Sequence, residues 1–187
     1  DEELDAYVNG EKAYVSAQDG DRPTLTVGYS VPVASGVRGQ AVSFLDGSDV
    51  TVSLFAAGSV QPQYTETVPA GEKNGGKYTA VYDIPSVAAG TYTVQVSKKN
   101  HVTREYTVTV GGDVKTLNAE IWLLGDVNGD GRVNAMDCTR LFKHVNKTQQ
   151  LTDPYALKCA ETNGDGRVNA MDCTRLFKHV NKTQLLW

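Results

Sequence analysis

The sequence has few of the residues on which many common functions depend. It contains three cysteines among 187 residues, and an odd number cannot close a complete disulfide framework. No stretch approaches the length of about 18 consecutive apolar residues that a membrane-spanning helix needs. Acidic residues outnumber basic ones, 22 against 18, and the net charge is −4. This balance argues against a chain whose whole surface binds nucleic acid or a membrane, because such surfaces are basic.

The cysteines Cys138, Cys159 and Cys173 all lie in the last third of the chain. Their spacing matches no zinc site, and we predict that they are reduced and buried as small apolar side chains. The chain starts with the acidic residues Asp1-Glu2-Glu3 and shows no signal peptide, as we expect of a mature or excised fragment. Apolar residues make up 40% of the chain, which is enough to bury a core.

The charge is divided unevenly along the chain. Residues 125–187 carry nine basic and seven acidic side chains, whereas residues 1–124 carry nine basic and fifteen acidic ones. Glycine, tyrosine and valine also become rarer after residue 119, where helix-forming residues take over. We therefore predict two domains, residues 1–122 and residues 123–187.

The first segment alternates between apolar and polar residues, which is typical of β-strands. About seven short strands in roughly 115 residues favour a two-sheet, all-β sandwich of the immunoglobulin-like (Ig-like) kind. Turn signals such as Asp46-Gly47 and Gly111-Gly112 separate the strands. The apolar positions of the expected strands are Leu25, Val27, Tyr29; Val42, Phe44; Val50, Val52, Leu54; Tyr78, Ala80, Tyr82, Ile84; Tyr92, Val94, Val96; Tyr106, Val108, Val110; and Leu117, Ala119, Ile121.

Little in this segment indicates chemistry. Its single histidine, His101, lies in an expected turn, where we predict an exposed side chain without catalytic function. Most of its tyrosines occupy the apolar phase of a strand, which favours core packing over a sugar-stacking surface. No tryptophan precedes residue 119. Structural support is therefore favoured over glycan binding.

The second segment contains an internal repeat. The 22 residues from Asn128 to Gln149 recur without a change from Asn163 to Gln184. Each copy begins with a loop that has oxygen-bearing side chains at positions 1, 3, 5, 9 and 12 and glycine at position 6, which is the spacing of a calcium-binding loop. The side chains at position 9 are Asn134 and Asn169, and Arg132 and Arg167 at position 7 would contribute backbone carbonyls. The other predicted ligands are Asp126, Asn128, Asp130 and Asp137 in the first loop and Glu161, Asn163, Asp165 and Asp172 in the second.

Two calcium loops with Asp at position 12, each followed by one helix, resemble the F-hand loops of a dockerin module. The resemblance covers about residues 121–187 and implies a small all-α, calcium-folded domain that binds two Ca²⁺ ions. It also implies a cohesin module on a scaffoldin as the partner, and an extracellular, cellulosome-like assembly of an anaerobic bacterium. The preceding segment resembles the Ig-like X modules that accompany some dockerins. Glu161 departs from the Asp expected at position 1, so we expect the second site to be weaker.

Each repeat continues into an amphipathic helix. Cys138, Leu141, Phe142 and Val145, with their copies Cys173, Leu176, Phe177 and Val180, are spaced as a buried stripe. His144 and His179 are expected to point outward. Asp153 and Pro154 predict the start of a short helix through Ala160. The resemblance assigns cohesin recognition to outward-facing positions, which are Ala135, Met136, Thr139, Arg140, Lys143, Lys147, Ala170, Met171, Thr174, Arg175, Lys178 and Lys182.

The resulting hypothesis is a non-catalytic assembly module, monomeric when free, at the end of a larger polysaccharide-degrading protein or scaffold. An alternative is the EF-hand-type calcium domain of a secreted glycoside hydrolase that also has a carbohydrate-binding β-sandwich. A calcium sensor is disfavoured, because a strand rather than a helix leads into the first loop. An enzyme is disfavoured by the lack of paired carboxylates outside the loops, of a nucleophile elbow and of a cofactor fingerprint.

Two further expectations concern contacts. Only residues 122–125 separate the last expected strand from the first loop, so we predict a fixed contact between the two segments. We also predict that Trp187 packs against the stretch from Ile121 to Leu124.

Overall fold

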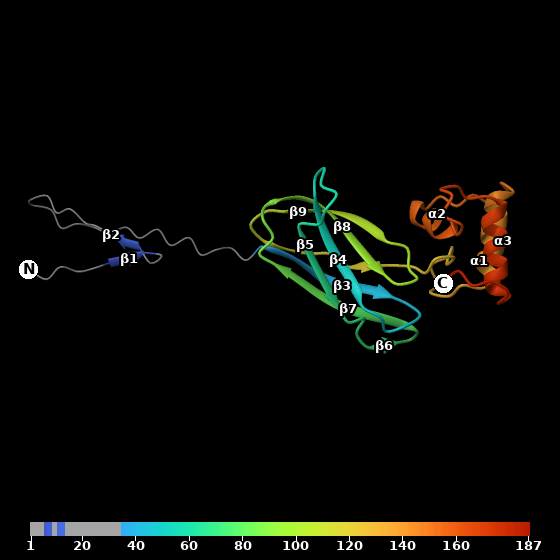
Figure 1. Cartoon of the computed structure of the whole chain (residues 1–187), viewed down its shortest axis with the longest axis horizontal. Coiled ribbons are helices and arrows are strands. Elements are labelled where there is room, and N and C mark those ends of the chain that lie inside the picture. Colours follow the sequence, from blue (N-terminus) through green and yellow to red (C-terminus); the bar gives the residue numbers. More distant parts are fainter. Residues whose placement is uncertain (1–5, 9–10, 14–34) are drawn as a thin grey trace, which may run out of the picture. The chain divides into compact units, whose positions relative to one another are not determined.

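The computed structural model describes residues 6–8, 11–13 and 35–187 (Figure 1). Contacts divide the chain into two compact units, Asp1–Pro32 and Val33–Trp187. In the first unit, β1 (Ala6–Val8) and β2 (Glu11–Ala13) form an antiparallel pair. The strand expected at Leu25 to Tyr29 lies outside the described residues.

The second unit begins with a β-rich region of two sheets that face each other (Figure 1). The first sheet has the order β10-β3-β7-β6, and β11 also pairs with β3. The second has the order β5-β4-β8-β9. The strands are β3 (Gly36–Ser43), β4 (Val50–Ala56), β5 (Tyr64–Val68), β6 (Lys73–Asn74), β7 (Lys77–Pro85), β8 (Gly90–Lys98), β9 (Arg104–Val110), β10 (Val114–Thr116) and β11 (Ala119–Glu120).

Alternating burial explains how the sheets pack. In β3 and β7, the paired residues Val37 and Ile84 both point into the core. In the other sheet, Val52 of β4 pairs with Val96 of β8, and neither side chain has exposed surface. Both sheets thus contribute to one apolar cluster, as the predicted alternation requires. The strand β5 was not predicted, because Glu66 occupies the middle one of its three inward positions and interrupts the apolar alternation.

The end of the β-rich region runs parallel to its first long strand. Both β10 and β11 pair with β3 in the parallel direction, and Ile121 N–H then donates to the Val42 carbonyl. This pairing leads the chain directly to the first predicted calcium loop, which starts at Asp126.

Three helices follow: α1 (Ala135–Val145), α2 (Pro154–Ala160) and α3 (Ala170–Val180). Asn134 and Asn169 cap α1 and α3 with matching capping boxes, in which Asp137 and Asp172 complete the reciprocal bonds. The predicted start and end of α2 are confirmed, with Asp153 as its N-cap. Helices α1 and α3 contact each other around a second apolar cluster, whose buried members are Val127, Leu141, Leu151, Ala160 and Leu176. None of the helices among the described residues is long and apolar enough to cross a membrane.

The predicted fold class, an all-β Ig-like sandwich followed by an all-α domain, is wrong. The structure has a β-rich region with two sheets and then a region with only three short helices among loops. Glycines in those loops adopt positive φ angles, +74° at Gly129 and +82° at Gly131, which interrupt any helix. Residues 33–187 also form one compact unit by their contacts, so a split into all-β and all-α parts is not shown. The boundary between residues 122 and 123 stays a prediction.

The predicted contact between the two segments is present. The Tyr155 hydroxyl on α2 donates to the Val102 carbonyl (2.5 Å) and accepts the N–H of Trp122 (3.0 Å). The Arg104 guanidinium lies 4.4 Å from the centre of the Tyr155 ring. Gly125 N–H donates to the Cys159 carbonyl at 2.9 Å. These bonds attach α2 to the end of the β-rich region.

Several side-chain predictions are wrong. Phe142 and Phe177 are 60% and 62% exposed, because the neighbouring leucines fill the space between α1 and α3. His101 is half-buried: its Nε2 accepts the N–H of Phe44 (3.0 Å), and its Nδ1 lies 2.7 Å from the Lys99 carbonyl. The single proton of the ring is therefore on Nδ1, since a carbonyl can only accept. Burial lowers the pKa of His101 to about 4.

The repeated histidines are half-buried too. His144 Nδ1 accepts the N–H of Leu151 (3.0 Å), and His179 Nδ1 accepts the N–H of Leu186 (3.1 Å). Each ring thus binds the chain that leaves its helix. The Trp187 ring lies against His179, at 4.5 Å between ring centres. Leu186 lies against Gly125, next to the stretch from Ile121 to Leu124, and the predicted packing of Trp187 on that stretch stays a prediction.

Candidate calcium loops and helical recognition faces

The first loop is organised around the carboxylate of Asp126, at position 1. This side chain is fully buried and accepts three backbone N–H groups, from Gly129 (2.7 Å), Asp130 (3.2 Å) and Gly131 (2.9 Å). Accepting these bonds requires the chain to fold around the carboxylate, and the positive φ angles of the two glycines permit the tight turn.

Asp137, at position 12, closes the first loop. It is fully buried, and its Oδ1 accepts the N–H groups of Val127 (2.9 Å) and Asn128 (3.2 Å). Its Oδ2 accepts the N–H of Asn134 at 2.9 Å. Asp137 is therefore part of both the helix cap and the loop. Its bonds determine where α1 begins relative to Asp126.

Burial makes the first loop electrostatically unfavourable without a cation. Desolvation, together with the nearby charges of Asp137 and Asp130, raises the pKa of Asp126 to about 6, although the N–H groups of Gly131 and Gly129 act in the opposite direction. Burial also raises the pKa of Asp137. Within residues 35–187 no ion pair that the structure shows involves either carboxylate. Two buried carboxylates of the same charge fit a divalent cation as their counter-charge.

The second loop repeats this arrangement with one change. Asp172 accepts the N–H groups of Thr162 (2.8 Å), Asn163 (3.2 Å) and Asn169 (2.9 Å), which matches Asp137 bond for bond. Glu161, in the place of Asp126, accepts the N–H groups of Gly164 (2.6 Å) and Asp165 (3.1 Å) and is only half-buried.

The other predicted ligands lie on the same loops. Asn128 and Asn163 donate from their amides to Asp130 and Asp165, both at 3.1 Å. The described residues contain no group of three His, Cys, Asp or Glu side chains arranged for a metal ion. The predicted ligand sets mix carboxylates with amide and backbone carbonyl oxygens, and calcium binds all three kinds. The donor chemistry therefore fits calcium, and the ligand assignments stay predictions.

The predicted recognition residues lie on the outer faces of α1 and α3. All are exposed except Arg175, which is half-buried and whose Nε has no hydrogen-bond partner among the described residues. Met136 and Met171 are 66% and 65% exposed, so the two copies match closely. The structure adds Phe142 and Phe177, which sequence periodicity had assigned to the core.

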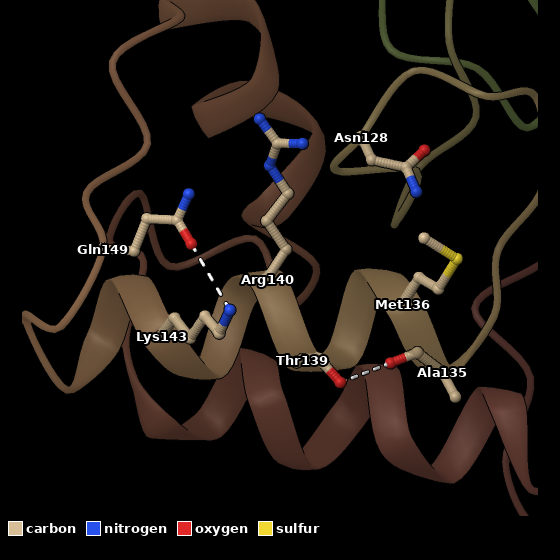
Figure 2. A pocket seen from close by; sticks show the side chains of 7 residues that line it. All are labelled: Asn128, Ala135, Met136, Thr139, Arg140, Lys143 and Gln149. Carbon is tan, nitrogen blue, oxygen red and sulfur yellow. Dashed lines mark hydrogen bonds between the residues drawn. The ribbon is translucent and has the colours of Figure 1, made fainter.

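On α1 the exposed residues border a shallow groove. Figure 2 shows Met136 extending toward Asn128 at one end and Lys143 near Gln149 at the other. Lys143 Nζ is 3.4 Å from Gln149 Oε1, and Thr139 Oγ1 donates to the Ala135 carbonyl at 2.9 Å. Arg140 lies between these ends. The groove therefore combines an apolar contact with basic side chains on one face.

A second groove lies between the two helices. It is lined by equivalent residues of both copies: Cys138, Thr139, Phe142, Cys173, Thr174 and Phe177. The cysteines are free, as predicted, but only Cys159 is fully buried. Burial raises the pKa of Cys138 and of Cys173, so both side chains are neutral thiols at neutral pH.

Comparison with known proteins identifies this region. Residues 124–181 match the family model described as dockerin type I domain. This segment is a dockerin type I domain. It contains both calcium loops and all three helices of the chain's described part. The predicted resemblance of this segment to a dockerin module is therefore confirmed.

Two solved structures that are similar to this chain come from Acetivibrio cellulolyticus. They are described as a C-terminal and an N-terminal interface mutant of a type II cohesin-X-dockerin complex. Each is 23% identical over 78% of this chain, covers 94% or 92% of its own chain, and has a TM-score of 0.33 or 0.29. At these TM-scores the similarity supports no conclusion about fold or binding. No curated protein sequence matches the chain.

Proposed function

We propose that the dockerin domain binds a cohesin module on a scaffoldin in a calcium-dependent manner and so attaches its parent protein to a cellulosome-like assembly. The match of residues 124–181 to the dockerin type I family carries this proposal. Two matching loop–helix units with exposed outer faces support it, because they provide the surface that such an interaction needs.

Dockerin domains bind calcium, and we propose two sites in this chain. In the first, Asp126, Asn128, Asp130, the Arg132 carbonyl and Asp137 would hold the ion. In the second, Glu161, Asn163, Asp165, the Arg167 carbonyl and Asp172 would do so. The ion would neutralise the carboxylates that each loop brings together, and folding of the small helical core would depend on it.

The recognition face would consist of Ala135, Met136, Thr139, Arg140, Lys143 and Lys147 on α1 and the equivalent residues on α3: Ala170, Met171, Thr174, Arg175, Lys178 and Lys182. An exposed methionine adapts to the shape of a partner, and the basic residues around it favour an acidic cohesin surface. Binding should therefore weaken as the salt concentration rises.

The remaining features belong to the same proposal. A dockerin domain is an interaction module and not a catalytic one, so any catalysis would belong to other parts of a larger polysaccharide-degrading protein. The β-rich region would accompany the dockerin as an X module, with residues 123–187 as the dockerin domain. The parent protein would be secreted or attached to the cell surface.

A cohesin panel tests the proposal. We expect the full chain to bind at least one cohesin with calcium present and to release it when a chelator is added. Replacing both position-12 ligands, Asp137→Ala with Asp172→Ala, should abolish binding. Asp113→Ala, which removes an exposed carboxylate from the β-rich region, is the matched control and should bind normally. Equal binding with and without chelator would contradict the proposal.

A further inference from the structure

The two calcium loops differ in what surrounds them. The Trp122 ring lies directly over Gly129, since a Cβ atom on that glycine would be 2.5 Å from the ring. The Phe44 ring lies over Gly131 in the same way, and a Cβ atom there would be 2.1 Å from it. Both aromatic residues come from outside the loop: Phe44 directly follows β3, and Trp122 lies shortly after β11. The β-rich region thus covers the backbone at positions 4 and 6 of the first loop.

Within residues 35–187 nothing covers the second loop in this way. A Cβ atom on Gly164 or Gly166, at the same two positions, would meet no atom of these residues within 4 Å. Both glycines are exposed, whereas Gly129 and Gly131 are half-buried. The sequence from position 3 onward is identical in the two loops, so this difference arises entirely from tertiary contacts.

In the covered loop, the carboxylate at position 1 also accepts more backbone hydrogen bonds than in the second loop. Asp126 is fully buried and accepts three backbone N–H groups, including that of Gly131. Glu161 is half-buried and accepts two. The N–H of Gly166, which corresponds to that of Gly131, does not bond to Glu161. A ring above Gly131 keeps its N–H directed at the carboxylate. It also excludes water, which strengthens the attraction between a carboxylate and a cation.

The two aromatic side chains are themselves held in place. Phe44 is 2% exposed, and its N–H donates to His101 Nε2. The Trp122 ring packs against Tyr155, 5.2 Å between centres, and its Nε1–H donates to Glu120 at 3.2 Å. These contacts fix the positions of both rings through groups outside the loop.

Two basic side chains, Lys77 and the loop's own Arg132, line the cleft beside the first loop, and Arg167 is the equivalent of Arg132 in the second loop. Lys77 lies beside Asp130 in the cleft between the loop and Phe44. Its Nζ is 5.5 Å from the centre of the Phe44 ring and 3.6 Å from the Glu120 carboxylate. The Lys77 charge is therefore already balanced by Glu120, and it does not cancel the effect of the aromatic cover.

We propose that the β-rich region forms part of the first calcium site, because Phe44 and Trp122 hold that loop in its metal-binding conformation. The first loop then binds calcium more tightly than the second, since less conformational entropy is lost when the ion binds. The coupling is reciprocal, so calcium in the first loop stabilises the contact between the β-rich region and the dockerin domain. This inference rests on the calcium binding proposed above.

Site-resolved calcium titration of the full chain tests the inference. The amide signals of Gly131 and Gly166 report on the two loops separately in NMR spectra. In the wild-type chain we expect the Gly131 signal to respond at lower calcium concentration than the Gly166 signal. Phe44→Ala and Trp122→Ala should each weaken the first site about tenfold or more, in the range of losses seen when groups that support metal ligands are removed. The second site should change less than about twofold.

Two controls separate this effect from general loss of stability. Val52→Ala removes part of the β-sheet core and should leave both affinities unchanged. Phe44→Leu retains an apolar cover and should lose less affinity than Phe44→Ala. Equal wild-type affinities, or variants that weaken both loops alike, would overturn the inference and leave the proposed function standing. The absence of calcium from both loops would overturn the proposed function as well.

Discussion

Leu141 and Leu176 have no exposed surface, whereas the residues that follow them, Phe142 and Phe177, are more than half exposed. Successive helix residues point about 100° apart, so only one residue of each pair can enter the buried core, and the other lines the exposed groove between the helices. The smaller leucine occupies that position in both copies.

The two residue types should therefore respond differently to truncation. Leu141→Ala should lower the free energy of unfolding by about 2–5 kcal/mol, because it leaves a cavity in the small helical core. Phe142→Ala should change it by about 0.5 kcal/mol or less. Denaturant unfolding with saturating calcium measures both, and Leu176→Ala with Phe177→Ala repeats the comparison in the second copy. Similar losses for leucine and phenylalanine would contradict this assignment.

His101 should make stability depend on pH. Its pKa is lowered to about 4 in the folded chain, chiefly by burial, from about 6.5 in the unfolded chain. Lys98 also lowers the pKa, while Asp46 and the Lys99 carbonyl oppose the shift. Between these two values the unfolded chain binds a proton that the folded chain does not, so the free energy of unfolding falls as the pH falls.

Unfolding measurements at pH 7 and pH 5 with saturating calcium test this contribution. His101→Gln, which lacks a titrating group but still offers an acceptor to Phe44 N–H, should lose less stability between these pH values than the wild-type chain. An identical loss in both proteins would show that His101 does not contribute.

The segment after α3 is hydrogen-bonded to a histidine of that helix, and the segment between α1 and α2 is bonded to α1 in the same way. Leu186 N–H donates to His179 Nδ1 as Leu151 N–H donates to His144 Nδ1. Leu186 also packs into the helical core beside Gly125. The last residues are therefore part of the folded helical region.

Removing this packing should destabilise the helical region. Leu186→Ala should cost about 1–2 kcal/mol through lost apolar burial, and deletion of residues 185–187 should lower the melting temperature further. Leu185→Ala is the matched control, because Leu185 is 58% exposed and should change little. A melting temperature unaffected by the deletion would show that the terminal segment adds no stability.

The whole molecule presents two near-equivalent exposed helix faces, which are the proposed recognition faces. The 22-residue repeat is identical, and Met136 and Met171 have almost the same exposure. Two identical loop–helix units suggest a pseudo-twofold relation, so a cohesin that contacts mainly one helix would find the same face in either orientation. Arg140 and Arg175 break this equivalence, because only Arg175 is half-buried.

We therefore predict dual-mode cohesin binding. Substituting Met136 and Arg140 by alanine should cost about 0.4 kcal/mol, the loss of one of two equal modes, RT ln 2. The same change at Met171 and Arg175 should cost equally little, and the combined variant should lose several kcal/mol, a non-additivity typical of coupled sites. Titration calorimetry with one cohesin measures all three, and a large loss from either single-face variant would exclude dual binding.

Local pattern was sufficient for the parts of the molecule that depend on near neighbours. Ligand spacing, the helix caps and the Pro154 helix start were predictable, because each depends on residues a few positions apart. Most strands were predictable from alternation. Helix spacing could not tell whether Leu141 or Phe142 enters the buried core, because both lie on the apolar side of the same helix.

Contacts between distant segments determined the remaining features. Loops with the same sequence from position 3 onward received different surroundings because, among the described residues, Phe44 and Trp122 cover only the first of them. His101 is half-buried because its turn packs beside Phe44, 57 residues earlier. The predicted all-β then all-α fold class was wrong, since residues 33–187 form one compact unit in which Tyr155 bonds a helix to the β-rich region, whereas the predicted domain boundary stays a prediction. A sequence repeat determines which groups can bind an ion. Packing against a distant segment determines how much each loop is held in place and how far it is shielded from water.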